Sequence, residues 1–514
     1  MVDLAITAPR TSGEHRAAKA AARLEDGLVR FLLLLGFAAL IRAPAWGEWN
    51  FGVDDQFYAL VGERLLHGDL LYVDVWDRKG PLLYLTFAAI ALVSPTMQAY
   101  QAAATLSAAL GAWGVERIAR RIATPAAAML AALAYLALLS RFEGDNLEAG
   151  VFFNSLVIAA AASFVSRMPL LRQGRIDAGL VAGFFCAGLA IAYKQTAAFE
   201  GALLGIAAVT MLWRAGTPFP ALAGKAAMLA AAGAAPMLAT GAFYWAGGHF
   251  AELWNAMVTS NFARGYADPG IRAARIFTMA GMLAIPVLFA ALGAAARWRE
   301  SEAEADRAIL RFVLLFVLLW ALTALAVIFA FPNIYVHYAQ SALPPLAILC
   351  AGYFSHRKPV WPGLLAVIGL SLALAGTFHL ADRWRARPAA QALVDHVRAE
   401  TPHQRLLVWG APSYLYSLVD ADPPSPLAFP PHLYEGREWT GLDEVAQVRR
   451  TLAARPETVV AQTPLPSSPL NGKTVALVDA YTRHCARKQV FTIYDHNGPQ
   501  VHTVFSRCSG NASR

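Results

Sequence analysis

Two polar stretches decide how this sequence is interpreted: Gly52-Val-Asp-Asp-Gln-Phe-Tyr58 and Tyr72-Val-Asp-Val-Trp-Asp-Arg-Lys-Gly-Pro-Leu-Leu-Tyr84. Together they place four acidic and two basic residues, the latter being Arg78 and Lys79, beside apolar segments. Charged groups are costly near the apolar part of a membrane and are retained there mainly for function. The two stretches are therefore the first candidates for a functional site.

Between the two stretches, apolar residues recur at helical spacing from Phe57 to Leu66, and Gly68 follows as a stop signal. This pattern predicts an amphipathic helix that lies in a membrane interface. Asp54 and Asp55 would start the helix, where a carboxylate is favoured as a cap. A structural explanation, with Asp54 as an N-cap and Lys79 as a membrane-surface anchor, therefore stands beside the functional one.

Length and composition indicate a polytopic α-helical membrane protein. Of the 514 residues, 57% are hydrophobic and 15% are charged, which is too apolar for a soluble protein of this size. Apolar segments near the spanning length of about 20 residues recur from Leu28 to Leu380 and then stop. We predict a cytoplasmic tail at 1–27, a transmembrane domain at 28–387 and a small extracytoplasmic α/β domain at 388–514.

About 11 transmembrane helices are expected. The candidate spans are 28–45, 98–116, 124–140, 149–166, 178–193, 197–213, 225–246, 273–296, 308–330, 338–355 and 361–380. Leu82–Val93 is apolar but only about a dozen residues long, which favours a juxtamembrane or re-entrant element. If it does not cross, all the basic loops lie on the side of the basic N-terminus, as the positive-inside rule requires. Topology thus explains the net charge of +8, and nucleic acid is excluded as a partner.

With this topology, the loops that hold the unusual polar residues are external, and the first of them is 46–97. The loop 141–148 carries Glu143, Asp145 and Glu148. It is either a solvated turn or a source of carboxylate ligands for a divalent metal shared with the aspartates of the first loop, since oxygen ligands suit Mg, Mn or Ca.

Further candidates lie at the ends of later spans. Lys194 is explained either by snorkelling or by binding of a lipid phosphate, and Glu200, one turn deeper, is its simplest partner. His337 and Tyr338 offer hydrogen-bond donors to a phosphate or a sugar hydroxyl, although an interfacial Tyr is commonly part of an aromatic belt.

The C-terminal part has the alternating apolar pattern of strands at 405–410, 458–461 and 474–478, and a hairpin is predicted about Asp495-His-Asn-Gly498. A helix is expected at 442–454. Cys485 and Cys508 flank the hairpin in an oxidising compartment, so we predict that they pair, whereas Cys186 and Cys350 lie in spans and pack there.

The first external loop resembles that of membrane-embedded GT-C glycosyltransferases, specifically bacterial relatives of protein O-mannosyltransferases, the aminoarabinose transferase of lipid A and the rhizobial lipopolysaccharide-core galacturonosyltransferases. In that family an Asp-Glu pair opens an interfacial helix and a Lys-Pro-Pro-like motif follows. Here the pair is Asp54-Asp55 and the motif is Lys79-Gly80-Pro81. Tyr335-Val-His-Tyr338, followed by Leu343-Pro-Pro345, resembles the family's His-Tyr and its Leu-Pro-Pro helix start.

The resemblance implies a glycosyltransferase of the bacterial inner membrane. It would transfer a sugar, with inversion, from a polyprenyl-phosphate donor to lipopolysaccharide, another cell-envelope glycan or a protein in the periplasm. Relatives carry mannose, galacturonic acid, arabinose or aminoarabinose, and the motifs do not distinguish among these sugars. A transporter or flippase of polyprenyl-linked glycans is the competing class, because it too would need external cations and charges within the membrane.

The site residues follow from the resemblance together with the chemistry. Asp54 is assigned as the base that takes the acceptor proton, and Asp55 assists it or binds metal. The residues assigned to the donor are Arg78, Lys79, Lys194, His337 and Tyr338; those assigned to a divalent metal, Mg or Mn, are Asp55, Glu143, Asp145 and Glu148.

The topology can be tested with alkaline phosphatase, which is active only where its disulfides form. A fusion after Arg514 is expected to be active, because the C-terminus is predicted to be external. A fusion after Arg121, in a predicted cytoplasmic loop, is the inactive control. A C-terminal reporter that works only in the cytoplasm would overturn the span count.

Overall fold

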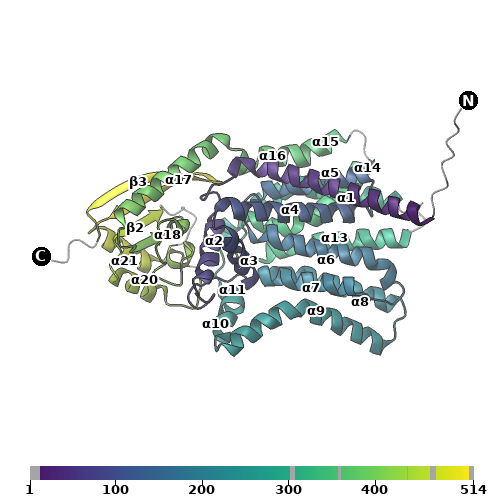
Figure 1. The fold of residues 1–514 in the computed structure, drawn as a ribbon, viewed down its shortest axis with the longest axis horizontal. Coiled ribbons are helices and arrows are strands. Elements are labelled where there is room, and N and C mark those ends of the chain that lie inside the picture. Colours follow the sequence, from purple (N-terminus) through teal and green to yellow (C-terminus); the bar gives the residue numbers. More distant parts are fainter. Residues whose placement is uncertain (1–11, 301–306, 357–359, 437, 463–469, 509–514) are drawn as a thin grey trace, which may run out of the picture.

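The computed structural model describes residues 12–300, 307–356, 360–436, 438–462 and 470–508. The described chain forms a long helical domain and a smaller α/β domain that packs against one end of it (Figure 1). Helix α2 lies at the junction of the two domains (Figure 1). This arrangement confirms the predicted fold class, a polytopic helical protein with a C-terminal α/β domain.

Each predicted span coincides with a helical segment. The segments are α1 (Ser12–Arg42), α4 (Met97–Ala119), α5 (Pro125–Arg141), α6 (Ala149–Leu171), α7 (Ala178–Tyr193), α8 (Ala198–Arg214), α9 (Phe219–Ala246), α12 (Pro269–Glu300), α13 (Arg307–Ala330), α14 (Leu343–His356), and α15 and α16 (Trp361–Leu364, Leu370–Ala373) joined by a π-helix. Within the described residues, 6 helices are long and apolar enough to cross a membrane, and several others are shorter apolar helices. The count of 11 spans therefore stays a prediction.

Local sequence explains where several helices begin and how closely they pack. Pro125 opens α5, where its fixed φ suits the first turn, and the Thr124 side chain caps that helix by accepting from the Ala127 amide. Glycines permit backbone contact between helices. Any side chain at Gly293 on α12 would overlap the backbone of α14 at Leu349, so this pair packs in the way of small-residue interfaces in membranes.

Two shorter helices, α2 (Val53–Leu66) and α3 (Pro81–Val93), come from the predicted first external loop. The expectation for α2 was wrong in two respects. Its N-cap is Gly52, so Asp54 and Asp55 lie inside the first turn, and neither caps it. Nor does α2 keep an exposed polar face along its length: it is buried from Asp55 to Gly62, because α3 packs against Tyr58 and Gly62 and Phe429 of the C-terminal domain packs against Phe57.

Helix α17 (Leu380–Glu400) spans the predicted boundary at 387/388 and leads into the C-terminal domain, which is built on a four-stranded sheet. The strands are β1 (Leu406–Trp409), β2 (Thr458–Gln462), β3 (Arg487–Asp495) and β4 (Gly498–Ser506), in the order β1-β2-β4-β3. β1 and β2 are parallel, and β4 pairs antiparallel with both β2 and β3. The helices are α18 (Tyr414–Leu418), α19 (Pro431–Tyr434), α20 (Glu444–Ala453) and α21 (Gly472–Thr482).

The hairpin predicted about residues 495–498 is confirmed as β3–β4, and Gly498 supplies the positive φ that its turn needs. The strand predicted at 474–478 is wrong, because this run belongs to helix α21. The Asn471 side chain accepts hydrogen bonds from the Lys473 and Thr474 amides. The cap thus commits the apolar run to a helix.

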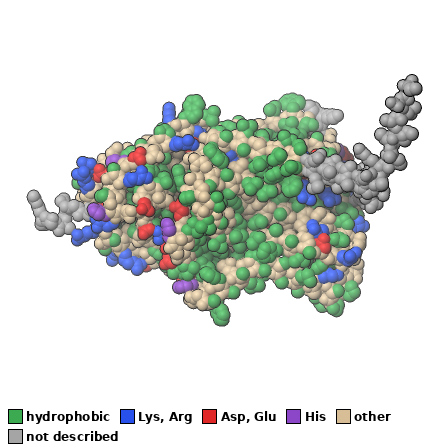
Figure 2. Space-filling model, viewed as in Figure 1, with side chains coloured by type: hydrophobic (Ala, Val, Ile, Leu, Met, Phe, Trp, Pro, Cys, Tyr) green, Lys and Arg blue, Asp and Glu red, His purple; other side chains and the backbone are tan. Residues whose placement is uncertain are grey.

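The surface follows the membrane interpretation. Figure 2 shows hydrophobic side chains over the broad middle of the molecule, with Lys, Arg, Asp and Glu gathered on the C-terminal domain and a further group of Lys and Arg at the opposite end. Large apolar side chains such as Phe243, Trp245 and Phe277 are mostly exposed. A belt of this kind is explained by contact with lipid.

Cys485 and Cys508 form a disulfide, as predicted, while Cys186 and Cys350 are free thiols. An alkylating reagent applied to the denatured, non-reduced chain is therefore expected to label 2 of the 4 cysteines, as measured by mass spectrometry. Cys485→Ser should lower the free energy of unfolding by about 2–4 kcal/mol, with Cys186→Ser as the near-neutral control. Labelling of all four thiols before reduction would contradict the pairing.

Candidate active site

Three predicted residues from distant parts of the chain meet between the membrane helices and the C-terminal domain. Asp54 lies in the first turn of α2, Glu148 precedes α6, and His337 lies in a 3-10 turn at Val336–Ala342 that leads into α14. Their ligand atoms all lie within 4.8 Å of one another. Glu148 is buried, and the other two are largely buried.

Lys79 lies against this group. Its Nζ is 3.1 Å from Asp54 Oδ1 and 3.3 Å from Asp77 Oδ2, and it stands 5.0 Å from the centre of the Tyr58 ring. Asp77 is itself held by a hydrogen bond from the Tyr84 hydroxyl. Lys79 is thus surrounded by groups that favour its charged form, so its pKa is raised although burial alone would lower it.

The position of Lys79 is set by the residue that follows it. The Gly80 amide donates to the Tyr193 carbonyl at 3.1 Å, and a Cβ at Gly80 would overlap the Ala192 carbonyl oxygen. The turn therefore rests directly on the C-terminal end of α7, and Pro81 then starts α3. Only glycine permits this approach, which fixes where the ammonium group of Lys79 can reach.

A second cation, Lys194, follows the last residue of α7. Its Nζ lies 4.6 Å from the centre of the Tyr338 ring. Burial lowers the pKa of Lys194 to about 8, and this effect exceeds the attraction of Glu148. No ion pair joins Lys194 to Glu200 within the described chain, and one carboxylate oxygen of Glu200 is buried without a hydrogen-bond partner.

The carboxylates of the site differ in their affinity for protons. Burial would raise the pKa of Asp54, but the attraction of Lys79 and His337 and the hydrogen bonds with Glu148 and Lys79 together lower it to about 2. Burial raises the pKa of Glu148 well above its usual range, and the charge of Asp54 adds to the effect. Burial also raises the pKa of Asp55 to about 7. Asp54 therefore binds a proton much less readily than its neighbour Glu148.

The acids assigned to a metal from the sequence have different partners. Asp55 accepts a hydrogen bond from the Leu147 amide at 2.6 Å. Asp145 lies 4.0 Å from Arg42 and accepts from Ser140 at 2.7 Å. These contacts hold the loop 141–148 in place and occupy one oxygen of each carboxylate. Of the predicted metal ligands, the described group that could hold an ion contains only Glu148, together with Asp54 and His337.

Two carboxylates and an imidazole suit a divalent cation, and the imidazole favours a transition metal over Mg²⁺. Asp54 contacts Lys79 through Oδ1 and hydrogen-bonds with Glu148, so a bound ion would take the place of the proton between the two carboxylates. The donor set therefore fits a divalent ion.

The C-terminal domain contributes charges from two sides. Glu438 forms an ion pair with Arg78 at 2.7 Å and another with Arg264, so Arg78 is bound to the C-terminal domain and not directed at the Asp54 group. On the other side, the tip of the β3–β4 hairpin brings His496 to within 3.4 Å of Glu143, which lies 3.1 Å from His337. No pattern in the sequence pointed to Glu438, and His496 was expected only as part of a hairpin turn, without a functional role.

Backbone contacts anchor the His496 side of the junction. The His496 amide donates to the Phe51 carbonyl at 3.0 Å, and Arg383 binds both Glu48 and the Asp495 carbonyl. Burial alone would lower the pKa of His496, but the hydrogen bond and charge of Glu143, the charge of Asp495 and the Phe51 carbonyl together raise it to about 9. The pKa of Glu143 is lowered in turn, since the hydrogen bonds from His337 and His496 outweigh its burial.

No protein-family model matches the sequence, and the curated proteins give no match to it. Among solved structures, the chain is similar to ArnT from Cupriavidus metallidurans bound to undecaprenyl phosphate, with a TM-score of 0.59 and 14% identity over 92% of this chain and 97% of that chain. The apo form of the same protein gives a TM-score of 0.58 and 15% identity, over 93% and 98%. AglB from Archaeoglobus fulgidus gives a TM-score of only 0.44 and 14% identity, over 84% of this chain and 69% of that chain.

These likenesses define the class: the chain has the GT-C fold, as the residues of its first external loop predicted. Within that class it has the ArnT arrangement, in which one chain carries both the membrane helices and the C-terminal domain over nearly the full length of each protein. At this level of identity the likeness establishes the fold alone.

The His496–Glu143 contact makes stability depend on pH. Because the folded pKa of His496, about 9, exceeds its ordinary value of 6.5, its contribution is complete below pH 6.5 and is lost as the pH rises through 9. The free energy of unfolding should decrease over this interval by an amount on the order of 2–3 kcal/mol. The melting temperature in detergent should therefore fall as the pH rises. His496→Gln should flatten this fall, while His484→Gln, an exposed control in the same domain, should not.

Other carboxylates near His496 also raise its pKa. The neighbouring Asp495 favours the charged imidazole, and the charge of His496 in turn favours the ionised form of Asp55. Glu143 acts in the opposite pH range: its lowered pKa stabilises the fold above its ordinary pKa of 4.5, and this stability is lost as the pH falls. An unchanged slope above pH 6.5 in His496→Gln would contradict the assignment.

Proposed function

We propose that the chain is a glycosyltransferase of the bacterial inner membrane that moves a sugar, with inversion, from a polyprenyl-phosphate donor to a periplasmic acceptor. The observation that carries the proposal is the meeting of an ionised carboxylate, Asp54, with two largely buried cations, Lys79 and Lys194, on a GT-C fold. Displacement of a phosphate at a sugar carbon requires a base for the acceptor proton and cations for the departing phosphate, and these three residues can supply both.

The donor side of the reaction is assigned to the two lysines. Lys79 stays charged, and an incoming phosphate would also favour the charged form of Lys194, whose pKa burial has lowered to about 8. As the bond from the anomeric carbon to the phosphate oxygen breaks, negative charge grows on the phosphate, and both ammonium groups stabilise it. The undecaprenyl phosphate in the ArnT structure supports a lipid phosphate as the ligand. Tyr338, under Lys194, positions that cation.

The acceptor side is assigned to Asp54, which would take the proton of the attacking hydroxyl as its oxygen bonds to the anomeric carbon. While Lys79 pairs with Asp54, the carboxylate is a weak base, because its pKa is about 2. A donor phosphate that binds Lys79 would draw the ammonium away from Asp54 and so raise its basicity. Donor binding would therefore prepare the base, and Asp54 would be least reactive when no donor is present.

A divalent ion, if used, would be held by Asp54, Glu148 and His337. When bound, it would supply positive charge for the departing phosphate. Glu143 would then position His337 from behind through its contact at 3.1 Å, much as outer carboxylates orient metal-binding imidazoles.

The acceptor is proposed to approach from the periplasmic side, where the C-terminal domain meets the site. The ion pairs of Glu438 and the hairpin at His496 hold that domain against the membrane helices. The boundaries 1–27, 28–387 and 388–514 remain our proposal for the cytoplasmic, transmembrane and periplasmic parts. The acceptor class is lipopolysaccharide, another envelope glycan or a protein.

Asp54→Asn tests the base. The change keeps the shape of the side chain and removes its basicity, so single-turnover transfer should fall by about 10²–10⁴ while donor-lipid affinity stays nearly unchanged. Lys79→Ala should lower both donor affinity and turnover, because this cation contacts the phosphate before and during transfer. Asp74→Asn, an exposed acid in the same loop, is the matched control.

Asp55→Asn separates the two neighbouring acids. The amide can still accept from Leu147, and Asp55 lies about 100° from Asp54 around the helix, so turnover should stay within a few fold of normal. Near-normal turnover in Asp54→Asn would refute its role, and an inactive Asp55→Asn beside it would move the base by one residue. Release of free polyprenyl phosphate from a lipid-phosphate sugar is the readout in each case.

A further inference from the structure

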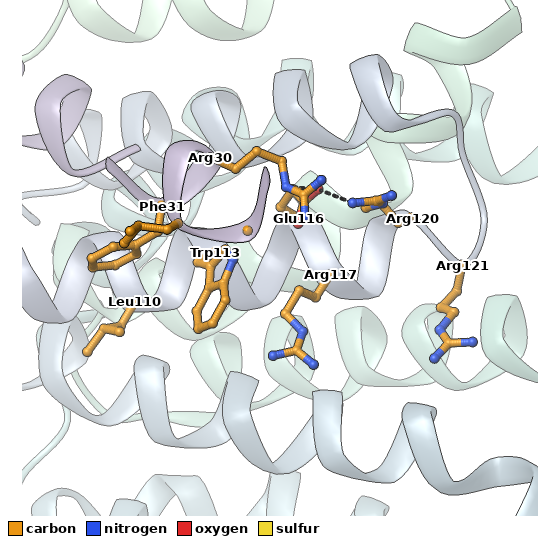
Figure 3. A pocket seen from close by; sticks show the side chains of 10 residues that line it. Arg30, Phe31, Leu110, Trp113, Glu116, Arg117, Arg120 and Arg121 are labelled. Carbon is orange, nitrogen blue, oxygen red and sulfur yellow. Dashed lines mark ion pairs between the residues drawn. The ribbon is translucent and has the colours of Figure 1, made fainter. Parts of the chain in front are cut away.

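A second charged region lies at the opposite end of the membrane domain from Asp54, between α1 and the C-terminal end of α4. It is a cavity of about 750 Å³ that contains four arginines beside apolar and aromatic side chains (Figure 3). The lining residues used below are Arg30, Arg117, Arg120, Arg121, Phe31 and Trp113. None of them takes part in the candidate active site.

A buried acid divides the arginines into two pairs. The Glu116 side chain is fully buried, and one of its oxygens lies 3.5 Å from both Arg30 and Arg120. Figure 3 shows these two arginines turned toward Glu116 and Arg117 turned to the other side. Glu116 thus neutralises part of the positive charge and holds Arg30 and Arg120 in place, which fixes α1 against α4.

The other pair is available to a ligand. Arg117 and Arg121 are exposed, and within the described part of the chain neither forms an ion pair with a carboxylate. The Arg117 guanidinium lies 5.2 Å from the centre of the Trp113 ring, which holds it beside the apolar wall. Two guanidinium groups on one side of a cavity are suited to a phosphate, because each can donate two parallel hydrogen bonds.

The apolar wall determines what kind of phosphate fits. Leu28 and Leu110 line the cavity and are 58% and 44% exposed, on the outer surface of α1 and α4 where lipid chains would lie. Phe31 and Trp113 pack edge to face at 5.8 Å and continue that wall. The positive-inside rule accounts for arginines near a membrane surface, but it requires neither a cavity nor a buried acid beneath them.

We propose that this cavity binds an anionic phospholipid of the adjoining leaflet, with its phosphate on Arg117 and Arg121 and its acyl chains along Phe31, Trp113 and Leu110. Binding would need no part of the transfer reaction and is independent of the proposed function. Its structural effect would be to secure the α1–α4 contact from the membrane side, because the lipid would touch both helices.

The test uses the full chain in detergent and native mass spectrometry with dimyristoyl phosphatidylglycerol or phosphatidylcholine. Wild type should retain phosphatidylglycerol in preference to phosphatidylcholine. Arg117→Gln and Arg121→Gln should each weaken phosphatidylglycerol binding about fivefold. Arg117→Gln combined with Arg121→Gln should remove the preference. Arg172→Gln with Arg175→Gln, exposed arginines in a loop at the same end of the helices, is the matched control and should keep it.

Two outcomes would overturn the proposal. One is an undiminished preference for phosphatidylglycerol in the double variant. The other is displacement of the lipid by an equal concentration of glycerol 3-phosphate, which would show a site for a free phosphate. Gel filtration and donor-transfer activity report folding of each variant, and Arg121→Gln alone decides the question should the double variant fail to fold.

Discussion

The ion pair between Lys79 and Asp54 is the interaction on which the rest of the site depends. Removing a charge from water costs several kcal/mol, so a largely buried ammonium and carboxylate persist only if partners satisfy them. Lys79 has Asp54 and Asp77 as partners, and Asp54 has Lys79 and a hydrogen bond to Glu148. The pair therefore requires α2, the turn before α3 and the loop before α6 to be in place together.

The C-terminal domain extends the same logic of paired charges. Arg78 and Arg264 are charges of the membrane domain that find their partner in Glu438, and Glu143 finds one of its partners in His496. Without Glu438, Arg78 and Arg264 would lose their ion-pair partner, and without His496, Glu143 would keep His337 alone. The domain thus completes the electrostatics of the membrane part, although no residue of its own belongs to the Asp54, Glu148 and His337 group.

Sequence reasoning succeeded where a physical signal is local and repeated. Apolar length marked each helical segment, and the turn chemistry of residues 495–498 identified the β3–β4 hairpin. It failed where a single side chain or a distant segment decides the outcome. The cap at Asn471 turned an apolar run into a helix, and packing of both α3 and the C-terminal domain buried α2 from Asp55 to Gly62.

The site shows the same division. Asp54, Lys79, Lys194, Glu148 and His337 could be selected because each is a polar residue near an apolar span. Which of them touch could not be deduced, since contacts such as Glu143 with His496 join residues more than 300 positions apart. Asp55 and Asp145 are examples: the Asp55 carboxylate accepts from the Leu147 amide, and the Asp145 carboxylate pairs with Arg42. Residue type alone does not distinguish a metal ligand from a carboxylate that makes such structural contacts.

The glycine that follows Lys79 has an evolutionary consequence. Its φ of −69° is one that proline could adopt, yet proline would lose the hydrogen bond to Tyr193 and collide with Ala192. A relative with proline at this position must end its counterpart of α7 farther from the turn. The residue that corresponds to Gly80 and the C-terminal end of α7 are therefore expected to change together among homologues. The distance between them would then keep the lysine at the same depth.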